Sequence, residues 1–591
     1  MSPAATTLCE AFQATTARHA GEVALRTADG SVELTFAEYA ARVRRITAGL
    51  AALGVRRGDT VALLMANRPE FHLCDTAAIH LGATPFSVYG TLAPEQIAHL
   101  FSNAGNRVVI TERGHLDRVR AARGDGPEPG HVVCVDGPAG GALSLHDLET
   151  MGDPAFDFEG AWRAVEPGDV LTLIYTSGTT GPPKGVEITH ANMLAECRAV
   201  AEVLPIRPGA RITSYLPSAH IADRWSSHYN QMVFGIQVTS VSDPRAVAAV
   251  LPEVRPTVWG AVPRVVEKLK AALDAAIAAD PDAQRREATR AAIDLGIHRV
   301  RLEQAGEPVP DEIAAQHAVA EERVLSRLRA RLGLDQAEWI LIGAAPLARD
   351  VHEFLLGLGL PVAELYGMSE CSCVVTACPP GEVRLGSVGR ALPGVELRVA
   401  GDGELLVRGP VVMRGYRGHP EQTAEAIDAE GWMHTGDIAT IDADGHVRIV
   451  DRKKELIINA AGKNMSPANI EGQLKAASPL IGQCVVIGDA RPYNVALLVL
   501  DPDAAAAHAR AHGLADSSVE AVAADPEVRR LVDGAVERAN GRLSRVEQIK
   551  RYALLAEEWL PGGDELTPTM KLKRKPIAAK HAATIDALYA G

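Results

Sequence analysis

The sequence predicts an α/β protein with a large N-terminal domain of layered sheets and helices, followed by a small α+β C-terminal domain. Its 591 residues, 47% of them hydrophobic, exceed what a single hydrophobic core usually holds. Through most of the first 450 residues, short β-branched runs alternate with Ala-rich amphipathic stretches, which is the pattern of parallel α/β layers. The runs that predict strands are Arg107–Thr111, Val170–Thr176, Trp339–Ile342 and Val362–Tyr366.

A helical insertion is predicted within the large domain, between Glu267 and Arg331. The composition there changes to Ala, Arg and Glu, with apolar residues at helical spacing, which indicates amphipathic helices. The stretch Asp280–Asp282 contains a proline and interrupts this pattern. We expect the insertion to pack on the domain rather than to act as a lid.

A second domain is predicted after the charged segment Asp451–Glu455. Several adjacent charges between two apolar strands belong in solvent, where a linker can bend. Beyond this segment, Gln483–Gly488 and Asn494–Leu500 flank a turn-rich connector and predict an antiparallel hairpin. We therefore expect an N-terminal domain over residues 1–450, a hinge over 451–455 and a C-terminal domain over 456–591.

The composition also limits the partners and the location of the protein. A formal net charge of −14 opposes non-specific attraction to nucleic acid or to an anionic membrane. No apolar run reaches the roughly 18 residues of a membrane span, and the first residues lack a signal-peptide pattern. We therefore expect a cytoplasmic protein.

The eight cysteines are expected to be reduced thiols in such a compartment. Cys371, Cys373 and Cys378 form a cluster, but zinc sites usually combine a Cys-x2-Cys pair with a second, distant pair. The cluster therefore favours structural thiols over a metal site.

The most informative segment is the loop that follows the strand predicted at Val170–Thr176. It reads Thr176-Ser177-Gly178-Thr179-Thr180-Gly181-Pro182-Pro183-Lys184-Gly185. Glycines let backbone amides turn toward an anion, hydroxyls add donors, and a lysine supplies positive charge. The loop is not a Walker loop, because no Ser or Thr follows Lys184. Its composition predicts a loop that binds polyphosphate.

Five ordered motifs together resemble the adenylate-forming superfamily, which contains acyl-CoA synthetases, luciferases and the adenylation domains of peptide synthetases. The loop above is the first motif. The other four are similar to the family's adenine and magnesium motif, ribose motif, interdomain hinge and catalytic-lysine motif, and they are Leu365–Glu370, Trp432–Asp437, Asp451–Leu456 and Leu566–Arg574. The last is closest to the form found in long-chain fatty acyl-CoA synthetases, including those of bacteria. The resemblance implies ATP and Mg²⁺ as cofactors, CoA as a co-substrate and a mobile C-terminal domain.

The resemblance also assigns nucleotide contacts to the matching residues. The residues implied to contact the phosphates of ATP are Thr176, Ser177, Gly178, Thr179, Thr180, Gly181 and Lys184, and those implied to hold Mg²⁺ are Thr176 and Glu370. Those implied to surround the adenine are Gly343, Ala344, Ala345, Tyr366, Gly367, Met368 and Ser369. The ribose would bind Asp437, whose ionised carboxylate only accepts hydrogen bonds, and Arg452.

The catalytic residues that the resemblance implies are Lys571, His220 and Glu370. Lys571 would stabilise negative charge during adenylation, and His220 would gate the acyl site or orient the acid carboxylate. Lys454 matches the pivot of the hinge. Gly462 and Lys463 would face the pantetheine arm of CoA after the small domain swings.

The sequence thus favours an ATP-dependent fatty acyl-CoA synthetase, whose partners are a medium- or long-chain fatty acid, ATP and CoA. Acyl transfer from AMP to a carrier protein, and ligation of an aryl or short-chain acid to CoA, use the same nucleotide motifs and stay open as alternatives. A non-enzymatic nucleotide-binding protein is disfavoured, because both Lys571 and Glu370 are present. Nucleic acid is not an expected partner, whereas a peripheral membrane contact and a homo-oligomer stay open.

Overall fold

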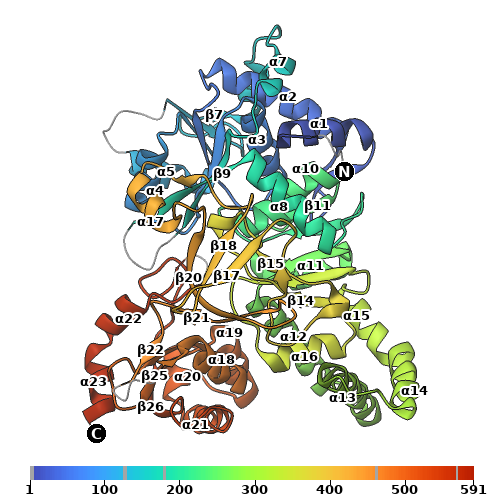
Figure 1. Cartoon of the computed structure of the whole chain (residues 1–591), viewed down its shortest axis with the longest axis vertical. Coiled ribbons are helices and arrows are strands. Elements are labelled where there is room, and N and C mark those ends of the chain that lie inside the picture. The colour runs from blue at the N-terminus through green and yellow to red at the C-terminus, as the bar shows by residue number, and fades with distance from the viewer. Residues whose placement is uncertain (1–4, 124–129, 177–181, 460–463, 568–569, 591) are drawn as a thin grey trace.

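The computed structural model describes residues 5–123, 130–176, 182–459, 464–567 and 570–590. Three sheets with their covering helices make up the N-terminal part, an antiparallel sheet follows in the middle, and a smaller sheet with helices lies toward the C-terminus (Figure 1). The predicted fold class, a large α/β part followed by a small α+β part, is therefore confirmed.

The largest sheet has eight strands in the order β19-β9-β8-β4-β3-β5-β6-β7. Strands β3 to β8 pair in parallel, whereas β9 and β19 run antiparallel to their neighbours. The strand bounds are β3 (Thr60–Leu64), β4 (Thr84–Ser87), β5 (Val108–Thr111), β6 (His131–Cys134), β7 (Leu143–Ser144), β8 (Val170–Thr176), β9 (Lys184–Thr189) and β19 (Gly415–Tyr416). In the β8–β9 hairpin, Thr176 pairs with Lys184, so the candidate phosphate loop connects two strands and its two ends are held together.

Two further sheets supply the other loops of the candidate site. One contains β10 (Arg211–Ser214), β11 (Gln237–Ser240), β1 (Val23–Thr27) and β2 (Glu33–Thr35), and the other contains β12 (Val258–Ala261), β13 (Trp339–Ile342) and β14 (Val362–Glu364). The four strands predicted from sequence are confirmed, with β14 ending two residues early. Ligands of parallel α/β sheets usually lie beyond the carboxyl ends of the strands, and the segments containing His220, Gly343 and Tyr366 follow such ends.

Helices cover both faces of these sheets, and several begin at side-chain caps. Thr35 and Thr189 form capping boxes with Glu38 and Asn192, which satisfy amide groups that lack partners at a helix start. The bounds are α1 (Leu8–Arg18), α2 (Phe36–Ala52), α3 (Pro69–His80), α4 (Pro94–Ala104), α5 (Leu116–Arg123), α6 (Leu145–Thr150), α7 (Phe158–Arg163), α8 (His190–Val203), α9 (Ile221–Asp223), the π-helical turn η2 (Arg224–Tyr229), α10 (Asn230–Phe234), α11 (Val247–Val254), α16 (Arg349–Gly357) and α17 (Pro420–Ala426).

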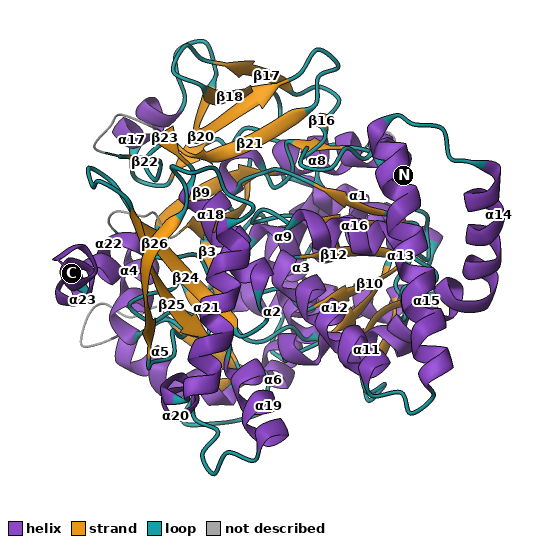
Figure 2. Ribbon diagram, turned by 90° about the horizontal axis from the view of Figure 1, so that it is seen from below, coloured by secondary structure: helices purple, strands orange, loops and turns teal. Residues whose placement is uncertain are grey.

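The predicted insertion is helical and comprises α12 (Pro263–Ala278), α13 (Ala283–Ala305), α14 (Asp311–Ala320), η4 (Glu321–Leu325) and α15 (Ser326–Leu332). The break at Asp280–Asp282 is confirmed, and Asp282 caps α13. Helix α13 packs on α16, as expected. Helix α14 differs, because it has no buried residue and stands at the periphery of the molecule (Figure 2).

An antiparallel sheet links the large part to the C-terminal part. It contains β17 (Glu396–Val399), β18 (Glu404–Arg408), β20 (Met433–Ile441) and β21 (Val447–Arg452). Short two-stranded pairs accompany it, namely β15 (Thr376–Ala377) with β16 (Arg390–Ala391) and β22 (Ile457–Ile458) with β23 (Asn464–Met465). Strand β21 leads directly into the segment predicted as the hinge.

The C-terminal part has a hydrophobic core of its own, between residues Ile457 and Ile549. The predicted hairpin is confirmed as β24 (Ile481–Ile487) and β25 (Asn494–Leu500), which pair antiparallel, and β26 (Ile549–Leu555) adds a parallel strand. Its helices are α18 (Pro467–Ala477), α19 (Pro502–His512), α20 (Val519–Ala524), α21 (Pro526–Asn540), α22 (Arg574–Lys580) and α23 (Ala582–Ala590). None of the described helices is both long and apolar enough to cross a membrane.

The crossing of α13 and α16 depends on two glycines. A Cβ atom on Gly296 would overlap the backbone carbonyl of Gly357, so Gly296→Ala must push the two helices apart. We expect a loss of about 1–3 kcal/mol in the free energy of unfolding, although alanine is the better helix former by about 1 kcal/mol. Chemical denaturation of the purified variant measures this loss.

Gly472→Ala in α18 is the matched control, because a Cβ there meets no atom within 4 Å. This variant should be as stable as the parent protein or slightly more stable. Equal stability changes in the two variants would contradict the close helix crossing.

Candidate active site

The candidate phosphate loop begins and ends on one strand pair. Thr176 is the last residue of β8 and Lys184 the first of β9. Between them, Ser177, Gly178, Thr179, Thr180 and Gly181 lie outside the described residues, and their predicted phosphate contacts remain predictions. The ammonium of Lys184 lies 4.1 Å from the centre of the Tyr416 ring, an arrangement in which the ring face attracts the positive charge.

Tyr416 also connects Lys184 to Glu370. Its hydroxyl donates a hydrogen bond of 3.0 Å to Oε1 of Glu370, and burial together with that carboxylate raises the pKa of the phenol. Sequence reasoning missed Tyr416, although it is the one Phe, Trp or Tyr between Tyr366 and Trp432 in the chain. The structure thus brings the predicted phosphate-binding lysine and the predicted metal-binding carboxylate to one aromatic residue.

The surroundings of Glu370 fit Mg²⁺ better than a metal held by protein alone. Mg²⁺ prefers oxygen ligands and in phosphate-transfer sites takes one or two carboxylates together with phosphate oxygens. Among the described residues, no group of three or more His, Cys, Asp or Glu side chains is arranged to hold a metal. The carboxylate of Glu370 is chemically suited to an ion that arrives with the phosphates, and the Mg²⁺ contacts of Glu370 and Thr176 stay predictions.

The segments predicted to surround the adenine are tightly constrained turns. Ala344, after β13, has a φ of 69°, a left-handed conformation that costs energy for any residue except glycine. A Cβ on Gly367 would overlap the carbonyl of Cys373, and one on Gly343 would lie 2.6 Å from the Leu365 side chain. These glycines are thus required by contacts within the protein. Ala345, Met368 and Ser369 lie in the same two turns.

The predicted ribose residues contact each other. Asp437 and Arg452 are opposite residues of β20 and β21, and Nε of Arg452 lies 3.3 Å from Oδ1 of Asp437. Tyr366, predicted beside the adenine, donates a 2.6 Å hydrogen bond to Oδ2 of Asp437. Burial raises the pKa of Asp437, and Arg452, Tyr366 and Lys571 oppose that rise. A carboxylate oriented in this way can accept hydrogen bonds from two hydroxyls.

Lys571 reaches this site from the C-terminal part of the chain. Its backbone is fixed by two hydrogen bonds: the amide of Lys571 donates to the hydroxyl of Thr567, and the amide of Thr567 donates to the carbonyl of Lys571. The residue as a whole is exposed to solvent. Partial desolvation of its ammonium by nearby protein and the charge of Arg452 lower the pKa of Lys571, while the carboxylates of Asp437 and Glu370 act in the opposite direction. The structure therefore brings Lys571 together with the predicted nucleotide site.

His220 joins the site from the loop after β10. Its Nδ1 accepts a hydrogen bond of 3.1 Å from the amide of Ala222, so the ring caps α9. Burial and the nearby charge of Lys571 lower the pKa of His220 to about 4. At neutral pH the ring is therefore neutral, and because Nδ1 accepts, the proton is on Nε2. His220 can therefore donate one hydrogen bond from Nε2, and it is a poor base.

Other predicted residues lie apart from this cluster or outside the described segments. Lys454 is exposed in a turn after β21, as the predicted pivot of a hinge would be. Gly462 and Lys463 lie outside the described residues. All eight cysteines, including Cys371, Cys373 and Cys378, are free and buried.

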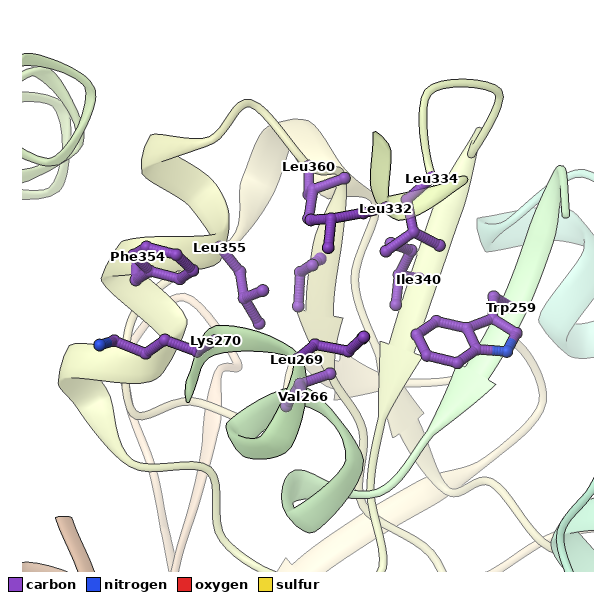
Figure 3. Close-up of a pocket in the computed structure, with 11 residues that line it drawn as sticks. Trp259, Val266, Leu269, Lys270, Leu332, Leu334, Ile340, Phe354, Leu355 and Leu360 are labelled. Atoms are coloured by element: carbon purple, nitrogen blue, oxygen red, sulfur yellow. The ribbon is translucent and has the colours of Figure 1, made fainter. Parts of the chain in front are cut away.

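The cavity shown in Figure 3 is separate from the cluster. It is lined by apolar side chains around α12, α15, β13 and α16, together with Lys270, and it measures about 10 Å³, room for roughly one water molecule. Thr84 and Val170, the first residues of β4 and β8, help to line an open cavity of about 500 Å³. It therefore lies at the end of β8 opposite Thr176.

Comparison with known proteins identifies the class of enzyme. The model of the AMP-binding enzyme family matches residues 12–417, and the model of the AMP-binding enzyme C-terminal domain matches residues 454–591. The chain therefore belongs to the AMP-binding enzyme family, the adenylate-forming class that the sequence motifs resemble.

Three individual proteins show how similar the chain is to known members of this class. A putative fatty-acid–CoA ligase, fadD11, of Mycobacterium tuberculosis is 57% identical over 76% of this chain and 79% of its own length. The long-chain-fatty-acid–CoA ligase FadD15 of Mycobacterium bovis is 36% identical over 94% of this chain and 92% of its own. The anthranilate CoA ligase AuaEII shares the fold with a TM-score of 0.73 at 19% identity, covering 98% of both chains.

The protonation state of His220 leads to a prediction. If His220 acts as a neutral Nε2 donor, His220→Gln should keep most of the acid-dependent rate, because a glutamine amide places an N–H donor at a similar position. His220→Ala should lower kcat/KM for the acid by about 10²-fold, the effect of losing one donor at developing charge. Initial-rate measurements of pyrophosphate release compare the two variants.

The pH dependence provides a second measurement of the same point. Because the pKa of His220 is about 4, the ring does not titrate between pH 6 and 8. His220→Gln should therefore leave the shape of the rate profile unchanged in this range. An inflection near pH 6.5 that disappears in His220→Gln would instead identify the histidine as a base.

Proposed function

We propose that the protein is an ATP-dependent fatty acyl-CoA synthetase. It joins the carboxylate of a fatty acid to the α-phosphate of ATP, releases pyrophosphate, and then transfers the acyl group to the thiol of CoA. The observation that carries the proposal is that Asp437 contacts both Tyr366 and Arg452, while Lys571, from a distant part of the chain, lies near enough to affect the pKa of Asp437 and of His220. The relatives named as fatty-acid–CoA ligases support the choice of acid and thiol.

In the first half-reaction an anion approaches a polyanion, so positive charge and donors must be in place before the reaction begins. Lys184 and the loop that follows Thr176 hold the β- and γ-phosphates. Asp437 and Arg452 fix the ribose. When Mg²⁺ is bound, held by Glu370 and Thr176, it neutralises charge on the phosphates. Lys571 stabilises the charge that develops between the carboxylate and the α-phosphate.

The acid is oriented by His220 in this proposal. A neutral ring with its proton on Nε2 donates a hydrogen bond to one carboxylate oxygen and leaves the other free to attack. Since a hydrogen bond from a neutral donor does not remove the negative charge, the carboxylate keeps its nucleophilicity. This function fits the low pKa of the ring better than proton abstraction does.

The second half-reaction requires Lys571 to leave and the thiol of CoA to enter. We propose that residues 456–591 move as a domain relative to residues 1–450, about a hinge at 451–455 with Lys454 as pivot. The exposed turn around Lys454 supports this division, as does the family match that begins at residue 454. Gly462 and Lys463 are the candidates to face the pantetheine arm after the movement.

The reaction is proposed to take place in the cytoplasm. Eight free cysteines fit a compartment in which thiols stay reduced.

Lys571 should be required for adenylation but not for thioester formation. Lys571→Ala removes a charge at the reacting centre and should slow adenylation by about 10²–10³-fold, while acyl transfer from a preformed acyl-adenylate to CoA continues. Pyrophosphate exchange measures the first step and thioester formation the second. A wild-type rate of pyrophosphate exchange in Lys571→Ala would refute the assignment.

The lowered pKa of Lys571 gives this prediction a pH signature. A lysine with a depressed pKa loses its proton earlier as the pH rises, so adenylation should decline at a pH below the usual lysine range. Lys571→Arg should abolish this alkaline decline, because a guanidinium keeps its proton. An unchanged alkaline limb in Lys571→Arg would show that another group titrates.

Chain-length preference tests the fatty-acid assignment. Each buried methylene contributes up to about 0.8 kcal/mol, so eight further carbons in a dry pocket add roughly 6 kcal/mol before ordering costs. Even half of that separates two acids about a hundredfold in kcat/KM. AMP formation with acetate, benzoate, octanoate and palmitate, below their aggregation limits, measures the preference. A preference for acetate or benzoate would overturn the fatty-acid assignment.

A further inference from the structure

Arg224 is a fully buried arginine at the start of η2, four residues after His220. Its Nη1 lies 2.7 Å from Oδ2 of Asp75 on α3, and both side chains are closed to solvent. Removing charges from water is costly, and a buried pair is retained only where its geometry and further hydrogen bonds compensate. The other contacts of Arg224 show which parts of the fold this ion pair connects.

Besides Asp75, the guanidinium contacts the loop before His220, the end of β4 and the far end of its own turn η2. Nε donates to the carbonyl of Ser218 at 3.1 Å, Nη2 to the hydroxyl of Ser87 at 2.9 Å, and Nη1 to the hydroxyl of Tyr229 at 2.8 Å. Ser87 ends β4 of the eight-stranded sheet, and Ser218 lies two residues before His220. Arg224 therefore ties the loop that contains His220 to the sheet that contains the candidate phosphate loop.

The same loop is held on its other side. The amide of Asn67 donates to the carbonyl of Leu216 at 2.8 Å and to the hydroxyl of Ser214 at 2.9 Å. The backbone amide of His220 donates to Pro217 at 2.8 Å. With these contacts and the bond from Arg224 to Ser218, the loop is fixed on both sides, so the direction of the His220 ring is set before a substrate binds.

Asp75 is itself oriented by a chain of neutral rings. Nε2 of His228 lies 2.9 Å from Oδ1 of Asp75, and Nδ1 of His228 lies 2.9 Å from Nδ1 of His72. Burial lowers the pKa of both histidines. Burial alone would raise the pKa of Asp75, but Arg224 and His228 outweigh it and lower the pKa. The carboxylate thus stays ionised opposite Arg224.

We propose that Arg224, oriented by Asp75, is a positioning residue for the acid half of the reaction: it fixes the Ser218–His220 loop so that Nε2 of His220 faces the carboxylate of the incoming acid. This inference rests on the proposed function. The bond to Ser218 lies two residues from His220, whereas the bond to Ser87 reaches the candidate phosphate loop only through the pairing of β4 with β8, so loss of Arg224 should affect the acid more than the nucleotide.

Two variants separate positioning from folding. Asp75→Leu/Arg224→Met replaces the buried pair by apolar side chains, an exchange that buried ion pairs often tolerate without loss of stability, but it removes the bonds to Ser218, Ser87 and Tyr229. Arg224→Lys keeps the charge, yet a single ammonium cannot reproduce the fork of a guanidinium. Arg42→Met, which breaks a partly buried pair with Glu149 between α2 and α6, is the control.

The readout is fatty-acid-dependent pyrophosphate release, with the acid and ATP varied in turn. In the double variant, kcat/KM for the acid should fall by about 10²-fold, the scale of a misplaced reacting group, while KM for ATP stays unchanged. Arg224→Lys should show a smaller fall of the same kind, and Arg42→Met none. If the double variant does not fold, Arg224→Lys decides the question alone.

A mutant cycle tests whether Arg224 acts through His220. If it does, His220→Ala/Arg224→Lys should be no slower than His220→Ala alone, because residues that act as one unit are not additive. Fully additive losses would overturn the proposal. So would wild-type kcat/KM for the acid in a folded Arg224 variant, or equal increases in KM for ATP and acid. Absence of acid-dependent pyrophosphate release from the wild-type protein would instead refute the proposed function.

Discussion

The balance of charge between two carboxylates and two cations determines the candidate site. Arg452 and Lys571 both lie near Asp437, and Lys571 also interacts electrostatically with Glu370. Enclosure by protein disfavours a charged lysine and a charged aspartate alike, so each supports the ionised form of the other. In the proposed reaction, ATP would bring further negative charge to the same place. The positive charge that the phosphates would meet is therefore already present before ATP binds, and until then the two carboxylates balance it.

Strain and close backbone contact give the candidate nucleotide site its shape. Ala344 adopts a left-handed conformation immediately after β13, and Gly367 lies so close to Cys373 that no larger residue fits. Such features persist only where the surrounding structure imposes them. The two turns predicted to surround the adenine are thus formed by packing within the protein, and their shape precedes the ligand.

The buried pair of Asp75 and Arg224 suggests a similar principle on the acid side. A buried ion pair is weak evidence for stability, since apolar replacements are often as stable. Its contacts instead join α3, the end of β4 and the loop before His220. The π-helical turn in which Arg224 lies is a rare conformation that is often found at functional sites. In the proposed site, both halves are therefore oriented by contacts of residues that do not themselves face the substrates.

Motifs and alternating apolar runs by themselves determined the α/β class, the predicted strands, the C-terminal hairpin and the nucleotide-binding character of the chain. Local sequence is sufficient for these features, because strand periodicity and loop composition express themselves over a few neighbouring residues. The exposure of α14 was not predictable, since its apolar spacing resembles that of a packed helix.

Only the tertiary structure decided which distant residues meet. Tyr416 contacts both Lys184 and Glu370, and Asp75 pairs with Arg224, yet no local pattern links these positions, because their contacts arise from the pairing of β19 with β9 and the packing of α3 on η2. The protonation of His220 likewise depends on the amide of Ala222 and on burial. A sequence motif can name a histidine, but the surrounding fold determines which nitrogen carries its proton.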